Sequence, residues 1–242
     1  MEPRYRFSPQ ELTGRSRGHI VDLVAPACSL HPAVVEPFLA LRAAAAVDGI
    51  DLLPVSSFRD FARQLNIWNA KCRGERELRD SEGVVVAAES LEPDALVSTI
   101  LHWSALPGAS RHHWGTDLDV VDAAAIPEGY RPQLVREEFA PGGLFAALDQ
   151  WLATHAVQFG FYRPYGSYRG GFQPEPWHLS HAPVAEQALQ QFSVAMLSQA
   201  LDEADIEARA ALQRCLPQIV ERYVMNVDAP PTGVAIRATR PA

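Results

Sequence analysis

Apolar residues recur every three or four positions in three stretches of this chain, and that spacing is typical of an amphipathic helix. The stretches are residues 32–47, 61–68 and 144–152. The first ends at Asp48-Gly49 and the third is followed by Gly160, and such residues commonly stop a helix. Three helices are therefore predicted.

Two other segments have the pattern of short strands. Residues 52–55 are mostly apolar and precede a polar turn, and residues 115–122 place apolar residues beside acids directly after a glycine. Residues 161–181 are aromatic, rich in glycine and interrupted by proline, which predicts loops and short strands. Residues 72–82 are highly charged and predict a solvated loop.

A few strands among helices, without strict strand-helix-strand alternation, predict an α+β fold. We expect an N-terminal arm over residues 1–31, a main domain over 32–182, a helical extension over 183–228 packed on it, and a disordered tail over 229–242. Pro217 lies in the extension, where it must kink or divide a helix.

The composition argues against a nucleic-acid-binding protein. The 242 residues are 48% hydrophobic and 21% charged, which is average for a soluble globular protein and enough for one sizeable core. The 21 basic and 29 acidic residues give a net charge of −8, and no basic stripe stands out. Nucleic acid is not an expected partner, because phosphate binding needs a basic surface.

Cysteine usage and the N-terminal sequence both favour the cytoplasm. Three cysteines, far apart and outside any C-x-x-C pair, predict reduced thiols and argue against disulfides and a cysteine-bound metal. Asp22 and Pro26 interrupt the apolar run near the N-terminus, so no secretory signal is predicted, and no stretch has membrane-spanning length. We expect a cytoplasmic protein unless another route exports it.

The first candidate chemistry lies in residues 110–119. His112 and Asp119 stand seven residues apart with Gly115 between them, and a turn at the glycine would bring both side chains to one point. Histidine nitrogen and aspartate oxygen are ligands that zinc accepts. On residue types alone, a hydrogen-bonded loop histidine followed by a capping aspartate is the more common arrangement.

A second segment strengthens the metal hypothesis. Glu175 and His178 stand three residues apart, with Pro174 and Pro176 around the glutamate. Pro176 disfavours a helix, and an extended chain would point the two side chains to opposite faces, so a shared site needs a bend there. With that bend, His178 supplies a third metal ligand, a water takes the fourth position, and Glu175 is the base beside it. Such a set is typical of a metal hydrolase.

Three motifs in this order resemble the peptidase M15 family of zinc D-alanyl-D-alanine carboxypeptidases of the VanY type. They are Ser56-Ser57-Phe58-Arg59 followed by Gln64, then Ser110-x-His112-x-x-Gly115-x-x-x-Asp119, and Glu175-x-Trp177-His178. The resemblance covers roughly residues 32–182 and leaves the N-terminal arm and the C-terminal helices unexplained.

The resemblance implies a small α+β domain with an antiparallel sheet and flanking helices, similar to Hedgehog and DD-peptidase domains. In it, His112, Asp119 and His178 would bind one zinc ion per chain, and Glu175 would be the general base. Arg59 would hold the substrate. The further residues implied to contact substrate are Gln64, Ser110 and Trp177, although packing is the more common role of a buried tryptophan.

The implied function is removal of a C-terminal D-Ala from peptidoglycan peptides by a zinc-activated water. Arg59 suits a free carboxylate, because a guanidinium pairs with it through two hydrogen bonds; the alternative is a surface ion pair with Asp60 or a nearby acid. A cytoplasmic D-Ala-D-Ala dipeptidase and a wall endopeptidase would use the same ligands. A non-catalytic zinc-stabilised binding module and a non-haem iron oxygenase are alternatives of other classes, and Glu175 beside His178 argues against both.

Asp117 departs from the family pattern, which has a small residue such as Ala or Ser there. Its carboxylate could orient a metal ligand or change the preference of the pocket, and the sequence leaves both open. His113 would point away from His112 in an extended chain and is expected at the surface or behind the site. The other histidines have no partner spacing and are expected to be structural. They are His19, His31, His102, His155 and His181.

Overall fold

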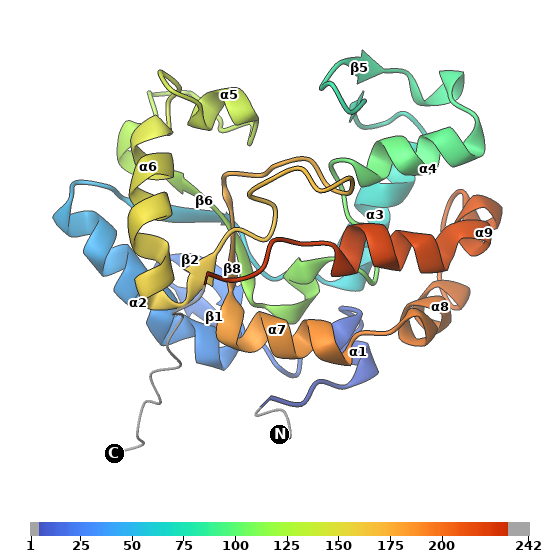
Figure 1. The fold of residues 1–242 in the computed structure, drawn as a ribbon, viewed down its shortest axis with the longest axis horizontal. Coiled ribbons are helices and arrows are strands. Elements are labelled where there is room, and N and C mark those ends of the chain that lie inside the picture. Colours follow the sequence, from blue (N-terminus) through green and yellow to red (C-terminus); the bar gives the residue numbers. More distant parts are fainter. Residues whose placement is uncertain (1–4, 232–242) are drawn as a thin grey trace.

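A four-stranded antiparallel sheet lies at the centre of the chain (Figure 1). It is seen in a computed structural model that describes residues 5–231. The strands, in spatial order, are β3 (Leu52–Ser56), β6 (Asp117–Asp122), β8 (His178–His181) and β7 (Phe161–Tyr162). Helices surround this sheet, which confirms the predicted α+β fold with a small antiparallel sheet.

Three helices lie where the hydrophobic pattern predicts them. They are α2 (Pro32–Val47), α3 (Phe61–Cys72) and α6 (Ala146–His155). The buried side of α2 has the three- and four-residue spacing of one helix face. It consists of Val34, Phe38, Leu41 and Ala45. Nε1 of Trp151 in α6 donates to Oδ2 of Asp48 at 2.7 Å, so the end of α2 is tied to α6.

The predicted solvated loop over residues 72–82 is partly wrong. It contains β4 (Leu78–Arg79), which pairs with β5 (Val85–Val86) in a short antiparallel hairpin. Helix α4 (Pro93–Leu101), which no sequence pattern singled out, contacts β4. Leu78 is buried, so one apolar residue among many charges is enough to anchor the hairpin on the core.

Residues 5–31 hold a short helix and a hairpin. These elements are α1 (Pro9–Leu12), β1 (Val21–Val24) and β2 (Ala27–Leu30). Leu12 and Leu30 are fully buried in the hydrophobic core. The carbonyl of Leu12 accepts a hydrogen bond from Nε1 of Trp114 at 3.2 Å. This N-terminal segment therefore packs directly against the part of the chain that carries the His112 motif.

The C-terminal part of the described chain is helical, as predicted. It contains α7 (Ala182–Gln191), α8 (Val194–Asp202), α9 (Arg209–Ile219) and a π-helical turn (Val220–Met225). Pro217 lies inside α9 and does not divide it; the helix widens into the π-helical turn three residues later. Asn69 of α3 bonds the backbone of Asp205 at 2.8 Å and of Glu207 at 2.9 Å, so the loop between α8 and α9 is tied to α3.

The tail predicted to be disordered lies mostly outside the described residues, which end at 231. Among residues 5–231, no helix combines the length and the apolar character needed to cross a bilayer.

A further short helix, α5 (Arg136–Phe139), lies near the start of α6 (Figure 1). It borders the site described below.

Gly115 ends the turn before β6 in a left-handed conformation, with φ 68°. A Cβ atom there would overlap Cδ1 of Ile20 and lie 2.8 Å from the backbone nitrogen of His31. We expect Gly115→Ala to lower the free energy of unfolding by about 3 kcal/mol or more, because backbone strain and overlap add.

The control for this prediction is Gly49→Ala. Gly49 has φ 81°, but nothing lies within 4 Å of a Cβ placed there. Only the backbone strain remains, so a loss of about 1 kcal/mol is expected. Urea unfolding measures both variants, and equal losses would contradict the packing argument.

Candidate active site

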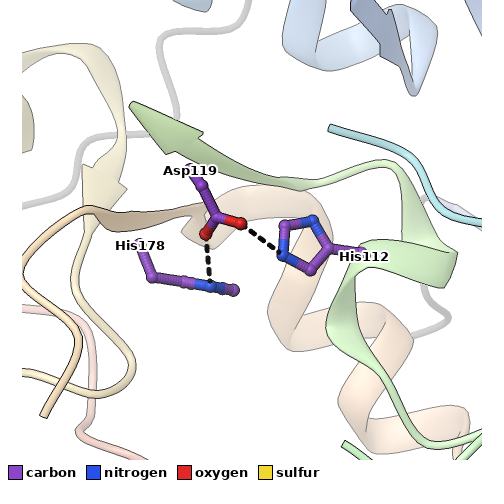
Figure 2. Close-up of side chains that lie close together, drawn as sticks. All are labelled: His112, Asp119 and His178. Carbon is purple, nitrogen blue, oxygen red and sulfur yellow. Dashed lines mark ion pairs between the residues drawn. The ribbon is translucent and has the colours of Figure 1, made fainter. Parts of the chain in front are cut away.

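Two histidines and an aspartate from three segments meet beside the central strands (Figure 2). Nε2 of His112 lies 3.3 Å from Oδ2 of Asp119, and Nδ1 of His178 lies 3.1 Å from Oδ1 of the same carboxylate. Each residue offers one ligand atom, and these three atoms lie within 4.8 Å of one another. All three residues are buried. The structure therefore brings together the three metal ligands predicted from the sequence.

The backbone positions each of these side chains. His112 lies on a 3₁₀ turn (Arg111–Trp114) closed by Gly115, after which the chain enters β6. Asp119 on β6 lies directly opposite His178 on β8 in the antiparallel register. Facing residues of neighbouring antiparallel strands project to the same side, with Cβ atoms about 4.5–5.5 Å apart. The strand pairing itself therefore brings the aspartate and the second histidine together.

The bend predicted at Pro176 is present. The backbone N–H of His178 donates to the carbonyl of Glu175 at 3.1 Å, which closes a turn, and β8 begins at His178. The turn brings Oε2 of Glu175 to 3.3 Å from Nδ1 of His178, the ring atom that also faces Asp119. The Glu175 carboxylate thus lies beside the three candidate ligands.

These residues fit a zinc ion. Oδ1 of Asp119 is buried and makes no hydrogen bond to a described residue, and a buried carboxylate oxygen needs a cation or a donor. Two imidazole nitrogens and a carboxylate oxygen are ligands that zinc binds at about 2.0–2.2 Å, with an open fourth position in catalytic sites. The ligand atoms would be Nε2 of His112, Nδ1 of His178 and a carboxylate oxygen of Asp119.

The charge states of Asp119 and His178 show that this cluster favours a bound cation. Burial by itself would raise the pKa of Asp119, but the imidazoles of His112 and His178 hold that pKa well below its ordinary value. Burial would likewise lower the pKa of His178, but the carboxylates of Asp117, Asp119 and Glu175 hold it well above its ordinary value. Three carboxylates around one imidazole therefore attract a cation, either a proton or a metal ion.

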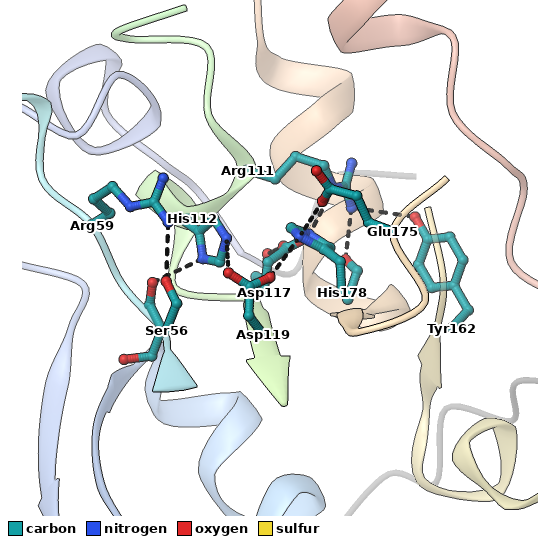
Figure 3. A network of polar contacts seen from close by, with 12 residues as sticks. Ser56, Arg59, Arg111, His112, Asp117, Asp119, Tyr162, Glu175 and His178 are labelled. Carbon is teal, nitrogen blue, oxygen red and sulfur yellow. Dashed lines mark hydrogen bonds and ion pairs between the residues drawn. The ribbon is translucent and has the colours of Figure 1, made fainter. Parts of the chain in front are cut away.

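A buried ion pair supports the ring of His178 from behind (Figure 3). Oδ1 of Asp117 accepts from Nε2 of His178 at 2.9 Å and from Nε of Arg111 at 2.9 Å. Arg111 also donates to Oγ of Ser180 at 2.7 Å and to the hydroxyl of Tyr162 at 3.3 Å. Because the Asp117 carboxylate accepts the proton of Nε2, Nδ1 is left as the ligand atom.

This geometry separates the two roles that the sequence leaves open for Asp117. Asp117 precedes Asp119 by two residues on β6, so both side chains project to the same side of the sheet. Asp117 is fully buried and does not line the cleft, which favours orientation of His178 over contact with substrate. Sequence reasoning missed Arg111, because nothing in the motif marks it as the partner of a carboxylate six residues later.

Arg59 extends from the turn after β3 toward the metal-binding residues (Figure 3). Its guanidinium donates to Oε1 of Gln64 at 2.7 Å and to Oγ of Ser56 at 3.0 Å. Asp60 instead caps α3, where its Oδ1 accepts from the backbone N–H of Arg63 at 2.7 Å. The surface ion pair considered for Arg59 and Asp60 is thus absent. The guanidinium is held by neutral partners and forms no ion pair with a described residue.

Three contacts join the Arg59 turn to the segment that carries His112. Nδ1 of His112 lies 2.9 Å from the carbonyl oxygen of Ser57, and the backbone N–H of Arg59 donates to the carbonyl of His112 at 3.2 Å. Nδ1 of His113 lies 2.5 Å from the carbonyl oxygen of Arg59. Burial lowers the pKa of His113 to about 3, so its ring is neutral. His113 lies behind the site, one of its two expected places, and is fully buried.

A cleft of about 470 Å³ opens over these residues, between α5 and the β4–β5 hairpin. Its lining includes the three candidate ligands together with Glu175, Arg59, Ser110 and Trp177. The ring of Trp177 packs against that of Phe139, with centroids 5.7 Å apart, and only 5% of Trp177 is exposed. Packing is thus the main role of this tryptophan, and one edge borders the cleft.

Gln64 does not face the cleft. It is fully buried, and its amide accepts from Arg59 and donates to the carbonyl of Ala105 at 2.7 Å. Its link to substrate is therefore indirect, through the position of the guanidinium.

An antiparallel sheet that presents two histidines, an aspartate and a nearby glutamate in one cleft defines a metallopeptidase. The sequence model of the VanY family, described as D-alanyl-D-alanine carboxypeptidase, matches residues 27–184. The match spans more than half of the chain, so this protein belongs to that family. The predicted family resemblance is confirmed.

Individual relatives are also similar. Two proteins of Haemophilus influenzae, both described as uncharacterized, are 38% identical over 122 residues and 42% identical over 104 residues. The matches cover 50% and 42% of this chain, and 93% and 71% of the relatives. Among solved structures, VanYB in complex with D-Alanine-D-Alanine is similar at 18% identity and a TM-score of 0.48, over 84% of this chain and 93% of that chain. The LdcB LD-carboxypeptidase is similar at 18% identity and a TM-score of 0.46, over 76% and 69%.

Substitution of Asp117 tests its support of His178. Asp117→Asn keeps the shape but removes the charge that polarises the ring, so we expect zinc affinity to fall about 10- to 100-fold. Asp122→Asn is a control on the same strand, where the carboxylate accepts the backbone N–H of Asp51 at 2.9 Å. Competition with a fluorescent chelator measures both affinities. Wild-type affinity in Asp117→Asn would assign this carboxylate to folding alone.

Proposed function

We propose that this chain is a zinc carboxypeptidase that removes the C-terminal D-Ala from peptidoglycan-derived peptides. The observation that carries the proposal is the guanidinium of Arg59. It shares a cleft with Glu175 and the three candidate ligands, and it has neutral hydrogen-bond partners. An arginine held in this way can pair with a free carboxylate at the end of a peptide. The description of the family names the same activity.

The residues divide the chemical work among them. A zinc ion held by His112, Asp119 and His178 would supply Lewis acidity toward the scissile carbonyl and the attacking water. Glu175, beside Nδ1 of His178, is placed to accept the proton of that water and to pass it to the leaving amine. Arg59 fixes the end of the peptide, which makes the reaction exopeptidic.

Removal of the general base should separate metal binding from turnover. Glu175→Gln is nearly isosteric but cannot accept a proton, so we expect zinc binding to persist while kcat falls about 10²- to 10⁴-fold. Elemental analysis and steady-state kinetics measure the two properties, and one zinc ion per chain is expected. Wild-type turnover in this variant would place the base elsewhere, and loss of zinc would make Glu175 a ligand.

Exopeptidase specificity is tested with matched peptides that end in a free acid or an amide. Amidation removes the charge that pairs with Arg59, and leaving a partly buried guanidinium unpaired costs about 2 to 5 kcal/mol. We therefore expect kcat/KM for the amide to be lower by a factor of about 30 or more. Equal rates would favour an endopeptidase.

Arg59→Lys keeps the charge but loses the two-pronged geometry, so it should weaken the discrimination between acid and amide peptides while zinc binding persists. Arg63→Lys is the control, because Arg63 is exposed on α3 and does not line the cleft. Discrimination that survives Arg59→Lys unchanged would assign carboxylate recognition to another group.

A pair of substrates, D-Ala-D-Ala and a pentapeptide, distinguishes a dipeptidase from a carboxypeptidase.

A further inference from the structure

Two cations on one wall of the cleft form no ion pair within the described part of the chain. Lys71 on α3 is half-buried and lines the cleft, and its side-chain ammonium makes no hydrogen bond or ion pair with any residue between 5 and 231. Arg76, in the loop after α3, also lines the cleft and has no such partner in the described chain. Both lie on the same wall as Arg59.

Neighbouring arginines show that carboxylates are available in this region. Arg73 pairs with Glu75 at 2.7 Å and with Glu207 at 3.5 Å, and Arg79 pairs with Glu77 at 2.6 Å. The chain as a whole carries a net charge of −8. The unpaired positive charge at Lys71 and Arg76 is therefore a local feature of the cleft, and a general excess of basic residues does not account for it.

The environment of Lys71 favours an anion. Burial, together with the charges of Arg76 and Arg59, lowers the pKa of Lys71 to about 8, although Glu175 and Glu77 oppose this shift. The ammonium is thus mostly charged at neutral pH but poorly solvated and close to the like charges of Arg76 and Arg59. A bound carboxylate would relieve both penalties.

We propose that Lys71 and Arg76 form a second anion subsite, which takes an acidic group of the substrate other than the C-terminal carboxylate. This inference rests on the proposed function, in which Arg59 holds the C-terminus. A single carboxylate neutralises one positive charge, whereas this wall presents three. The substrate class is therefore an acidic peptide that carries a second carboxylate near the scissile bond.

The test uses matched peptides that differ by one charge. One pair of acetylated tripeptides ending in D-Ala-D-Ala has Glu or Gln at the preceding position, and a second pair ends in D-Glu or D-Gln. We expect the wild-type protein to prefer the acidic member of at least one pair by about tenfold or more in kcat/KM, since charge-assisted hydrogen bonds contribute about 1.5–3 kcal/mol. Absence of a preference in both pairs would overturn the subsite.

Variants at Lys71 and Arg76 then test whether these residues cause the preference for the acidic peptide. Lys71→Gln and Arg76→Gln should each reduce the acid-to-amide ratio, and together they should bring it to about twofold or less. Arg73→Gln is the control, because Arg73 lies outside the cleft and is already paired; it should keep the wild-type ratio. A ratio that persists in the Lys71 and Arg76 double variant would also overturn the proposal.

Failure of the subsite and failure of the proposed function give different results. If no peptide is cleaved, the carboxypeptidase proposal fails. Calorimetric binding of the same peptide pairs to zinc-loaded Glu175→Gln protein then tests the subsite alone. If peptides are cleaved without any preference for the acidic member, only the subsite fails.

Discussion

The antiparallel register of β6 and β8 is the constraint on which the site depends. It sets Asp119 directly opposite His178, and it places Asp117, two residues earlier, on the same side of the sheet behind the same ring. Side chains alternate between the faces of a strand, so a slip of one residue would turn His178 away from both carboxylates. The pairing of β6 with β8 thus brings together candidate metal ligands that neither strand holds alone. Gly115 adopts the left-handed conformation at the end of the turn before β6, and this turn lets His112 reach Asp119 from the preceding segment.

Charged side chains buried around these strands would be costly without partners, and the structure provides partners for most of them. Arg111 and Asp117 neutralise each other, and Ser180 and Tyr162 accept further hydrogen bonds from the guanidinium. His113 contributes differently, as a neutral ring that ties the Arg59 turn to the His112 segment. Such a network holds ligand and substrate-binding groups in one arrangement before any substrate arrives, which lowers the entropic cost of binding.

Two groups of charged side chains line different parts of the cleft. The carboxylates of Asp119 and Glu175 lie at the candidate metal ligands, whereas Arg59, Lys71 and Arg76 lie on a wall formed by the turn after β3, by α3 and by the loop that follows. Glu77 on the same wall is paired with Arg79. In the proposed function, the first region would hold the cation and the second would hold the anionic groups of a peptide. The C-terminal segment contributes from a distance, because the loop between α8 and α9 bonds Asn69 of α3.

The sequence by itself determined the α+β class and the helices α2, α3 and α6, and it singled out His112, Asp119, His178 and Glu175 as candidate site residues, because helix periodicity and ligand spacing are local properties of the chain. It also required the bend at Pro176, which the structure contains. Only the tertiary structure decided that Asp117 supports His178, that Gln64 holds Arg59 from a buried position, and that Lys71 and Arg76 form no ion pair with residues 5–231. Helix α4 and the β4–β5 hairpin likewise emerged only in three dimensions. These features depend on contacts between residues far apart in the chain. Asp117 and His178, for example, are 61 positions apart, and a local sequence pattern cannot predict such a contact.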